Sequence, residues 1–202
     1  MKDELEVAAG RDVSRETVEK LKAYVSLLRE ESQHQNLIAR STLDELWQRH
    51  ILDSAQLVRF EPSRDAAWVD IGAGAGLPGI VLACLVDRPV TLIEPRRLRA
   101  EFLHKVTGEL RIGAIIEQNK VEAVRGTFDV ITARAVAPLP RLLKISAHLS
   151  TTKTRWILPK GRRAEDELAE ARRSWHGVFH VERSLTDEDS LIIVATDVRA
   201  RK

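Results

Sequence analysis

The sequence predicts an α/β fold: a seven-stranded, mainly parallel sheet with an antiparallel edge strand, preceded by a helical extension. Three observations support this prediction. From residue 66 onward, short β-type runs alternate with helical runs, as in parallel sheets that helices cover on both faces. A glycine-rich turn follows the first of these strands. Only the turn-forming segment Thr186-Asp187-Glu188-Asp189 separates the last two strands, so we expect them to form an antiparallel hairpin.

Length and composition bound the number of domains. The chain has 202 residues, which is enough for one well-buried domain with an appendage but too few for two full domains. Hydrophobic residues make up 44% and charged residues 31%, as in ordinary soluble proteins. We expect a helical extension over residues 1–65 and one compact domain over residues 66–202.

Cysteine content and hydropathy point to a reducing compartment. The one cysteine, Cys84, cannot form an internal disulfide, and its apolar surroundings in the sequence favour core packing. No apolar stretch approaches the length of a membrane span, and charged residues follow Met1 where a signal peptide would have an apolar core. We therefore expect a cytoplasmic protein with no membrane partner.

Two amphipathic helices are expected in the extension. Ser14 is a good N-cap residue, and apolar residues follow it at helical spacing: Val18, Leu21, Val25 and Leu28. Thr42-Leu43-Asp44-Glu45 resembles a capping box for a second helix, whose apolar stripe is Leu43, Leu46, Trp47, Ile51, Ala55 and Val58. The other face of that helix offers Arg49, His50 and Asp53, and residues 33–40 are expected to form a polar loop.

The elements of the sheet domain follow from β-type runs and helical periodicity. Strands are expected at residues 67–71, 89–94, 114–118, 128–133, 154–159, 179–183 and 191–196. Helices are expected at residues 78–86, 97–109, 138–149 and 163–174. Because the helices fall between the earlier strands, these strands are expected to run parallel.

The turn after the first strand is the most informative part of the chain. Four glycines occur within eight residues: Gly72, Gly74, Gly76 and Gly79. Glycine is needed where the backbone has a positive φ or lies against a ligand with no side chain between them. Four glycines exceed the need of one tight turn, so we expect a nucleotide-binding turn, with a purely structural turn as the alternative.

Two details favour S-adenosylmethionine over a dinucleotide in this turn. The pattern Gly74-x-Gly76-x-x-Gly79 matches the dinucleotide fingerprint, and Glu94 ends the second strand where that fingerprint expects an acidic residue. However, Pro78 stands where the helix should begin, whereas a pyrophosphate needs free N–H groups at a helix start. S-adenosylmethionine has no phosphate, and Asp70 could bind its amino group. A nicotinamide or flavin site is the alternative.

Glu94 is one of several candidates at the carboxyl ends of strands, where doubly wound sheets bind their ligands. Its carboxylate would accept hydrogen bonds from the two ribose hydroxyls of a nucleoside. The alternative is a surface ion pair with Arg96 or Arg97. Val121 and Glu122 follow the third strand and are expected at the adenine edge, with an exposed helix start as the alternative.

Two basic residues follow the fourth and fifth strands. Arg134 comes after a very apolar strand, where an unpaired charge is costly to bury, so we expect it to face a ligand. Lys160 stands in the same relation to the fifth strand, and a solvated turn is the alternative for it.

Five motifs occur in the order and spacing of one known family. They are Asn36-Leu37, Arg49-His50-Ile51-Leu52-Asp53-Ser54, the segment from Asp70 to Gly79, Thr132-Ala133-Arg134-Ala135, and Leu158-Pro159-Lys160-Gly161. From about Val18 to its end, the chain resembles the RsmG (GidB) family of bacterial small-subunit rRNA methyltransferases. The resemblance implies a class I, Rossmann-like fold and methyl transfer from S-adenosylmethionine to N7 of a guanine in the 530 loop of 16S rRNA. The cofactor contacts that it implies are Gly72, Leu77, Val121, Glu122 and Arg134.

The chemistry of the residues agrees with N7 as the target. Methylation of a pyrimidine carbon typically needs a cysteine nucleophile, and Cys84 is expected to be buried. Methylation of an exocyclic amine usually involves an Asn/Asp-Pro-Pro-aromatic turn, where this chain has Ala133-Arg134-Ala135-Val136. Guanine N7 has an in-plane lone pair and no proton to lose, so no general base is needed. We expect Arg134 and Lys160 to act by orientation, which can lower a barrier by on the order of 7–11 kcal/mol.

Basic residues are expected to bind the RNA partner. The net charge of +2 decides little, but basic residues cluster at Arg96, Arg97 and Arg99, at Lys160, Arg162 and Arg163, at Arg172 and Arg173, and at Arg199, Arg201 and Lys202. We expect RNA contacts at Arg49, His50, Lys160, Arg162, Arg163 and the C-terminal segments, and solvated helix faces are the alternative for the basic clusters. For His50, a hydrogen bond with Asp53 or the backbone is the alternative to a role in proton transfer. The family usually has two basic residues where this chain has Leu98 and Arg99, so no RNA contact is assigned to residues 96–99.

The expected partner is 16S ribosomal RNA or a precursor of the small subunit, with no DNA and no metal. Three other functions stay open from the residues alone. They are a small-molecule methyltransferase on the same cofactor domain, a nicotinamide-dependent oxidoreductase, and a non-enzymatic RNA-binding module, in which the glycine turn would have no use.

Overall fold

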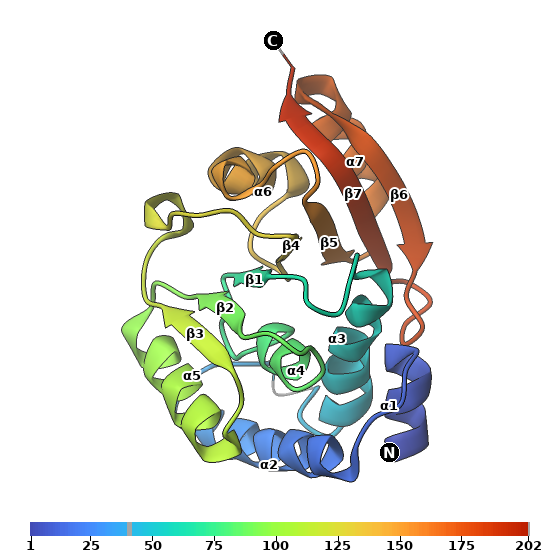
Figure 1. The fold of residues 1–202 in the computed structure, drawn as a ribbon. Helices are drawn as coiled ribbons and strands as arrows, with labels where there is room; N and C mark the ends of the chain where they lie inside the picture. Colours follow the sequence, from blue (N-terminus) through green and yellow to red (C-terminus); the bar gives the residue numbers. More distant parts are fainter. Residues whose placement is uncertain (40–41, 202) are drawn as a thin grey trace.

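The computed structural model describes residues 1–39 and 42–201, so two residues of the sequence prediction lie outside it: Arg40 of the polar loop and Lys202 of the last basic cluster. A seven-stranded sheet forms the centre of the molecule (Figure 1). The strands are β1 Trp68–Ile71, β2 Val90–Ile93, β3 Ala114–Glu117, β4 Val130–Thr132, β5 Arg155–Lys160, β6 Trp175–Arg183 and β7 Leu191–Ala200.

The order of the strands in the sheet is β3-β2-β1-β4-β5-β7-β6. The first five of these pair in parallel, whereas β7 runs antiparallel to both β5 and β6. The predicted fold class is therefore confirmed, with the antiparallel hairpin of β6 and β7 at one edge. The direction of winding reverses between β1 and β4, and such a reversal opens a crevice at the carboxyl ends of the two strands.

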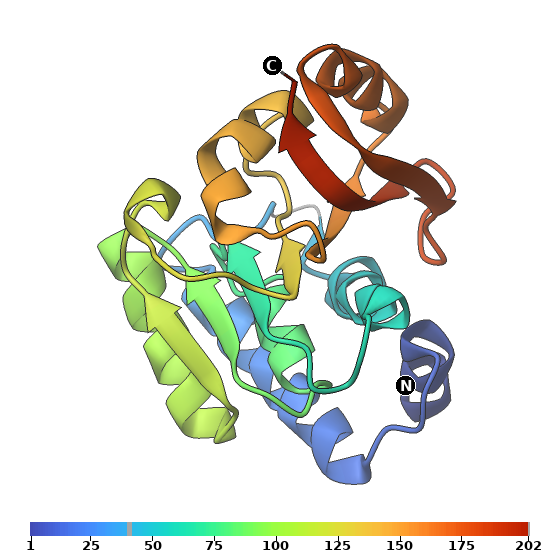
Figure 2. The same ribbon diagram turned by 45° about the horizontal axis from the view of Figure 1, so that its top comes forward.

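Helices cover both faces of the sheet (Figures 1 and 2). One face carries α1 Lys2–Ala9, α2 Arg15–Glu31, α3 Asp53–Ala55, α4 Gly79–Ala83 and α5 Arg97–Leu110. The other face carries the 3-10 turn η4 Val121–Ala123, α6 Leu139–Ser146, the 3-10 turn η5 Ala147–Leu149 and α7 Ala164–Ser174. Among the described residues, none of the helices combines the length and the apolar composition that crossing a bilayer requires.

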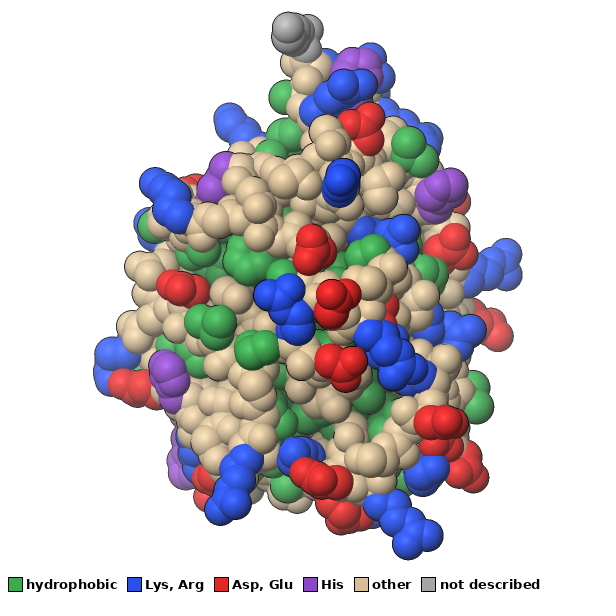
Figure 3. All heavy atoms as spheres, in the orientation of Figure 1, with side chains coloured by type: hydrophobic (Ala, Val, Ile, Leu, Met, Phe, Trp, Pro, Cys, Tyr) green, Lys and Arg blue, Asp and Glu red, His purple; other side chains and the backbone are tan. Residues whose placement is uncertain are grey.

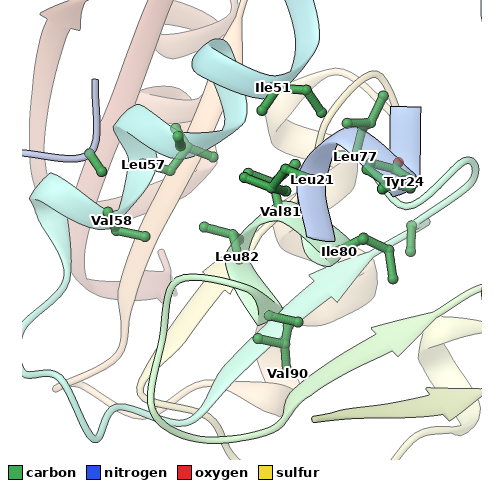
Figure 4. Close-up of a cluster of buried hydrophobic side chains, with 14 of the residues drawn as sticks. Leu21, Tyr24, Ile51, Leu57, Val58, Leu77, Ile80, Val81, Leu82 and Val90 are labelled. Atoms are coloured by element: carbon green, nitrogen blue, oxygen red, sulfur yellow. The ribbon is translucent and has the colours of Figure 1, made fainter. Parts of the chain in front are cut away.

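The sheet separates two apolar clusters because successive side chains of a strand point to opposite faces. In β1, Trp68 belongs to the first cluster, and Val69 and Ile71 belong to the second. Figure 4 shows the first cluster, in which Tyr24 of α2 lies beside Leu77. The N-terminal helices thus share a core with the sheet. The division between residues 65 and 66 stays a prediction.

The first predicted helix and the helices of the sheet domain occur in the predicted order. Ser14 caps α2, since its hydroxyl accepts the Thr17 N–H at 3.0 Å. The helix α5 begins at residue 97, as predicted, and ends one residue later than predicted. The helix α4 is shorter than predicted and ends at Ala83 instead of Val86.

The N-terminal extension differs from its prediction at two places. The helix α1 was not expected, because its buried face consists of Leu5 and two alanines, a weak apolar signal. The second predicted helix begins only at Trp47 and is irregular: the π-helical η2 Trp47–Leu52 leads into α3 and then into the 3-10 turn η3 Gln56–Phe60. The capping box at Thr42 is wrong, because the Glu45 N–H donates to the Thr42 backbone carbonyl and not to its hydroxyl, and the helix begins only at Trp47. The hydroxyl donates to the Ala39 carbonyl and contacts His50.

Candidate functional site

The turn after β1 touches the ends of both neighbouring strands. On the β2 side, the Ala73 N–H donates to the Ile93 carbonyl at 3.0 Å, and the Gly74 N–H donates to Glu94 Oε2 at 2.9 Å. On the β4 side, a Cβ built on Gly72 would lie 2.7 Å from Cγ2 of Val136. The glycine turn, Glu94 and the loop of residues 134–138 therefore meet at the crevice between β1 and β4.

The four glycines differ in what surrounds them. A Cβ on Gly76 would lie 2.5 Å from Cγ1 of Ile80, and a Cβ on Gly79 would collide with the side chains of Leu92 and Asp70. Gly72 leaves no room either, because Val136 lies against it. A Cβ on Gly74 would meet its nearest neighbours only at 3.6 Å, and the φ of this residue is +57°. Gly74 is buried, but it is the one of the four where a Cβ would displace no packed side chain, whereas the other three glycines permit close packing within the protein.

Asp70 lies buried beneath this turn with one unsatisfied oxygen. Its Oδ2 accepts the Gly79 N–H at 2.9 Å, and its buried Oδ1 has no hydrogen-bond partner among the described residues. Burial raises the pKa of the carboxyl to about 7, against the opposing effects of the Gly79 hydrogen bond and the Arg134 charge. Because buried polar atoms in proteins are nearly always paired, Oδ1 is suited to a donor that arrives with a ligand.

The raised pKa of Asp70 predicts a pH-dependent stability. In the folded protein the Asp70 carboxyl keeps its proton up to about pH 7, whereas in the unfolded chain it loses the proton near pH 4. The contribution of Asp70 to the stability of the fold is therefore complete below pH 4 and is lost as the pH rises through 7. Asp70→Asn cannot ionise. We therefore compare the melting temperature of Asp70→Asn with that of the unsubstituted protein at two pH values. We expect the variant's advantage to be several degrees larger at pH 8.5 than at pH 5. Thermal unfolding without ligand measures this difference, and a difference that is the same at both pH values would contradict the burial argument.

Glu94 is buried, and both of its carboxylate oxygens bind backbone N–H groups. Oε2 accepts from Gly74, and Oε1 accepts from Arg96 at 2.8 Å. The surface ion pair with Arg96 or Arg97 is therefore wrong as an explanation of this carboxylate, and Arg97 pairs with Glu101 instead. Each oxygen can accept a second hydrogen bond, which leaves room for the predicted ribose contact.

Three further predicted cofactor contacts come from the glycine turn and from η4, which follows β3. Leu77 is buried in the first apolar cluster, next to Tyr24 (Figure 4). On η4, Val121 is buried in the second cluster, and Glu122 is exposed. The roles of these three residues at a cofactor stay predictions.

Tyr24 connects the N-terminal helix α2 to the glycine turn. Its buried hydroxyl donates to the Ala75 carbonyl at 2.8 Å, and its oxygen would lie 3.1 Å from a Cβ on Gly76. We expect Tyr24→Phe to lower the free energy of unfolding by about 1 kcal/mol, the worth of one hydrogen bond. We also expect a severalfold weaker affinity for S-adenosylmethionine, because the turn loses an anchor. Calorimetric titration measures this affinity, and an unchanged dissociation constant would show that α2 does not position the turn.

A cavity of about 530 Å³, here called the β4–β5 hollow, lies beyond the carboxyl ends of β4 and β5. Arg134 and Lys160 both line it, together with Asp53 and Glu167. Lys160 is only 10% exposed, and its Nζ donates to the Ala137 carbonyl at 3.0 Å and to Glu167 Oε2 at 2.9 Å. The solvated turn is therefore wrong for Lys160, which holds the loop of residues 134–138 in place.

A second cavity of about 290 Å³, here called the His50 hollow, shares Arg134 and Asp53 with the first. Arg49 and His50 line it, so the predicted catalytic and RNA-binding residues gather around two adjoining hollows. Nη1 of Arg134 lies 3.2 Å from His50 Nδ1 and 3.5 Å from Asp53 Oδ2.

Two residues of this region were not predicted as site residues. Asp53 was the easier to find, because it belongs to the same motif as Arg49 and His50. Glu167 gave no local signal, because it is one of three acidic residues in the first turn of α7, and only the fold brings it to Lys160.

The predicted RNA contacts Arg49, Arg162 and Arg163 are exposed. Arg49 pairs with Glu45 at 2.7 Å, Arg162 pairs with Asp189, and Arg163 precedes α7. Figure 3 shows positive and negative side chains interspersed over the face turned to the viewer. RNA binding by these arginines stays a prediction.

Cys84 has no part in either hollow. It packs at the edge of the first apolar cluster, and burial raises the pKa of its thiol to about 12. The thiol therefore stays protonated at neutral pH and is a poor nucleophile, as the argument against attack on a pyrimidine carbon requires.

Comparison with known proteins identifies relatives over most of the chain. A family described as rRNA small subunit methyltransferase G matches residues 17–187. The protein named ribosomal RNA small subunit methyltransferase G from Zymomonas mobilis is 46% identical over 199 residues, which cover 94% of this chain and 90% of that protein. The protein of the same name from Novosphingobium aromaticivorans is 47% identical and covers 88% of this chain and 80% of its own length.

Two solved structures resemble the fold at low sequence identity. A mutant of MtNAS in complex with S-adenosylmethionine has a TM-score of 0.59 at 20% identity, over 87% of this chain and 75% of that one. The TYW2 protein of M. jannaschii in complex with AdoMet has a TM-score of 0.55 at 12% identity, over 82% of this chain and 78% of its own. At these identities the likeness is one of fold.

Proposed function

Because the chain belongs to the rRNA small subunit methyltransferase G family, we propose that it methylates N7 of one guanine in the 530 loop of 16S ribosomal RNA. Membership makes it an S-adenosylmethionine-dependent methyltransferase of small-subunit ribosomal RNA, and favours this activity over a small-molecule methyltransferase. The choice of N7 and of the 530 loop rests on the family resemblance together with the chemistry of the site.

Two observations carry the cofactor proposal: a Cβ at Gly74 would crowd no protein atom, and the buried carboxylate of Asp70 has an oxygen without a partner among the described residues. Asp70 Oδ1 would accept from the amino group, which in S-adenosylmethionine is cationic, and this cation would favour the ionised carboxylate. Glu94 would accept from the ribose, while Val121 and Glu122 would lie at the adenine. When bound, S-adenosylmethionine supplies an electrophilic methyl group.

The two hollows at the end of β4 are the proposed place for the target nucleotide. Among the described residues, Nε and Nη2 of Arg134 have no hydrogen-bond partner, so they are available to the cofactor or to the base. In the described part of the chain, the two groups next to Arg134 that could act as a general base, His50 and Asp53, are both engaged with it. Attack by N7 needs none, which agrees with a site that acts by orientation.

Methyl transfer to RNA is tested with small ribosomal subunits and rRNA from cells that lack this enzyme. We expect tritiated methyl groups from S-adenosylmethionine to enter the RNA, at a single guanine that chemical cleavage at 7-methylguanosine locates. The same reaction with naked rRNA, an assembly intermediate and the mature subunit identifies the true substrate. Labelling of free metabolites alone would contradict RNA as the target, and labelling at a guanine outside the 530 loop would contradict the site. We also propose the cytoplasm as its location, since its substrate is found there.

A further inference from the structure

A chain of hydrogen bonds joins Arg134 to the N-terminal segment. Nη1 of Arg134 lies 3.2 Å from Nδ1 of His50. The other ring nitrogen, Nε2, lies 3.1 Å from the Thr42 hydroxyl, and that hydroxyl donates to the Ala39 carbonyl at 2.9 Å. The loop after β4 is linked in this way to the irregular helix η2, 84 positions earlier in the sequence, and through it to the residues that precede η2.

The direction of each hydrogen bond follows from the chemistry of the groups. A guanidinium can only donate, so Nδ1 of His50 must be unprotonated and accept from Arg134. The proton of the Thr42 hydroxyl is used by Ala39, so this oxygen accepts from Nε2–H. The imidazole is therefore neutral and held in one tautomer. Neither ring nitrogen is free to take up or release a proton during catalysis.

We infer that His50 is a positioning residue, which orients the Arg134 guanidinium for its ligand, and that it does not itself contact RNA. This inference rests on the proposed function, in which Arg134 binds the cofactor or the target base. His50 and Asp53 both contact Nη1 of Arg134, so the N–H groups of Nε and Nη2 stay available for the ligand. Asp53 is fixed in turn, because its Oδ1 accepts from Gln56 at 2.8 Å and from Thr186 at 3.0 Å.

The charges around His50 keep this arrangement intact over the working pH range. Arg134 and Arg49 face the ring, while the carboxylates Asp53 and Asp187 line the same hollow. Burial and the two arginines lower the pKa of His50 to about 4. Protonation would direct an N–H at the guanidinium, so we expect the orientation of Arg134 to be lost only in acid, well below pH 6.

Two substitutions of similar size separate orientation from RNA contact. In His50→Asn, the side-chain oxygen can accept from Nη1 in place of Nδ1, whereas His50→Leu fills the space and accepts nothing. We expect His50→Leu to lower kcat on small subunits by about ten- to a hundredfold, as loss of a hydrogen bond to a charged group allows. The KM for the subunits should stay within about twofold, and His50→Asn should recover most of the loss.

The inference would be overturned if His50→Leu and His50→Asn lost the same factor in kcat. It would also be overturned if His50→Leu raised the KM for the subunits and left kcat unchanged. The second outcome would make His50 an RNA contact. Should His50→Leu fail to fold, Thr42→Val interrupts the same chain at its far end, and a smaller loss of kcat at unchanged KM is expected. The affinity of each variant for S-adenosylmethionine is measured as well. If the unsubstituted protein labels no RNA, the proposed function fails. The positioning role would still be supported if His50→Leu bound S-adenosylmethionine more weakly than His50→Asn.

Discussion

Gly74→Val is expected to lower the affinity for S-adenosylmethionine by at least about 100-fold, which corresponds to about 2.7 kcal/mol of binding free energy. A valine side chain at this position would fill the space that the backbone leaves open, since its nearest neighbours lie 3.6 Å from the Cβ. Because the built Cβ meets Nη1 of Arg99 and the Gly72 carbonyl oxygen only at ordinary van der Waals distance, the substitution should leave the core packing in place. Calorimetric titration gives the dissociation constant.

The positive φ of Gly74 requires a control for backbone strain. A β-branched residue in the left-handed region costs about 1–2 kcal/mol. This strain lowers the free energy of unfolding even if no ligand contact is lost. Gly126 has a φ of +113° and no heavy atom within 4 Å of a built Cβ, so Gly126→Val strains the backbone at least as much, away from the glycine turn. We expect Gly126→Val to lose at least as much stability as Gly74→Val, and only Gly74→Val to lose affinity. Tight binding by Gly74→Val would refute the proposed cofactor position.

Arg134→Ala is expected to lower turnover on small ribosomal subunits by about 10²–10³-fold, the usual effect of removing one oriented, charged donor from an active site. The fold should survive, because Arg134 is partly exposed and Asp53 keeps its hydrogen bonds to Gln56 and Thr186. Single-turnover methyl transfer and thermal unfolding measure the two effects separately.

Two further variants define the role of Arg134. Arg134→Lys keeps the charge, but its three N–H groups sit on one nitrogen and cannot reproduce the planar guanidinium that binds His50 through Nη1 and presents Nε and Nη2, so we expect it to recover only a small part of the activity. Lys22→Ala removes an exposed cation that pairs with Glu19 on α2, and we expect it to behave like the unsubstituted protein. A loss of melting temperature in Arg134→Ala large enough to account for its lost activity would assign this residue a structural role.

Local patterns sufficed to predict the order of the elements. The apolar run of β1 and the alternation of strands with helices required a buried parallel sheet, and Thr186-Asp187-Glu188-Asp189 correctly marked the hairpin. The glycine turn was found as well, but the distinct roles of its glycines were not. These roles depend on contacts with side chains far away in the sequence, such as Val136 against Gly72 and Leu92 against Gly79.

The parts that escaped prediction lack a regular period or a local partner. The helix η2 is π-helical, so the spacing of 3.6 residues that predicted a regular helix there does not apply. Lys160 was expected to orient the substrate, and its pairing with Glu167 and Ala137 became visible only in the structure. His50 and Arg134 are 84 positions apart, so their hydrogen bond could not be read from spacing.

A crystal structure of the protein with S-adenosylhomocysteine tests the position of the cofactor most directly. We expect the nucleoside to lie over Gly74, with its amino group at Asp70 Oδ1 and its ribose hydroxyls at Glu94. The β4–β5 hollow should stay open for the target nucleotide. A ligand found in that hollow instead, with the space above Gly74 empty, would contradict the account.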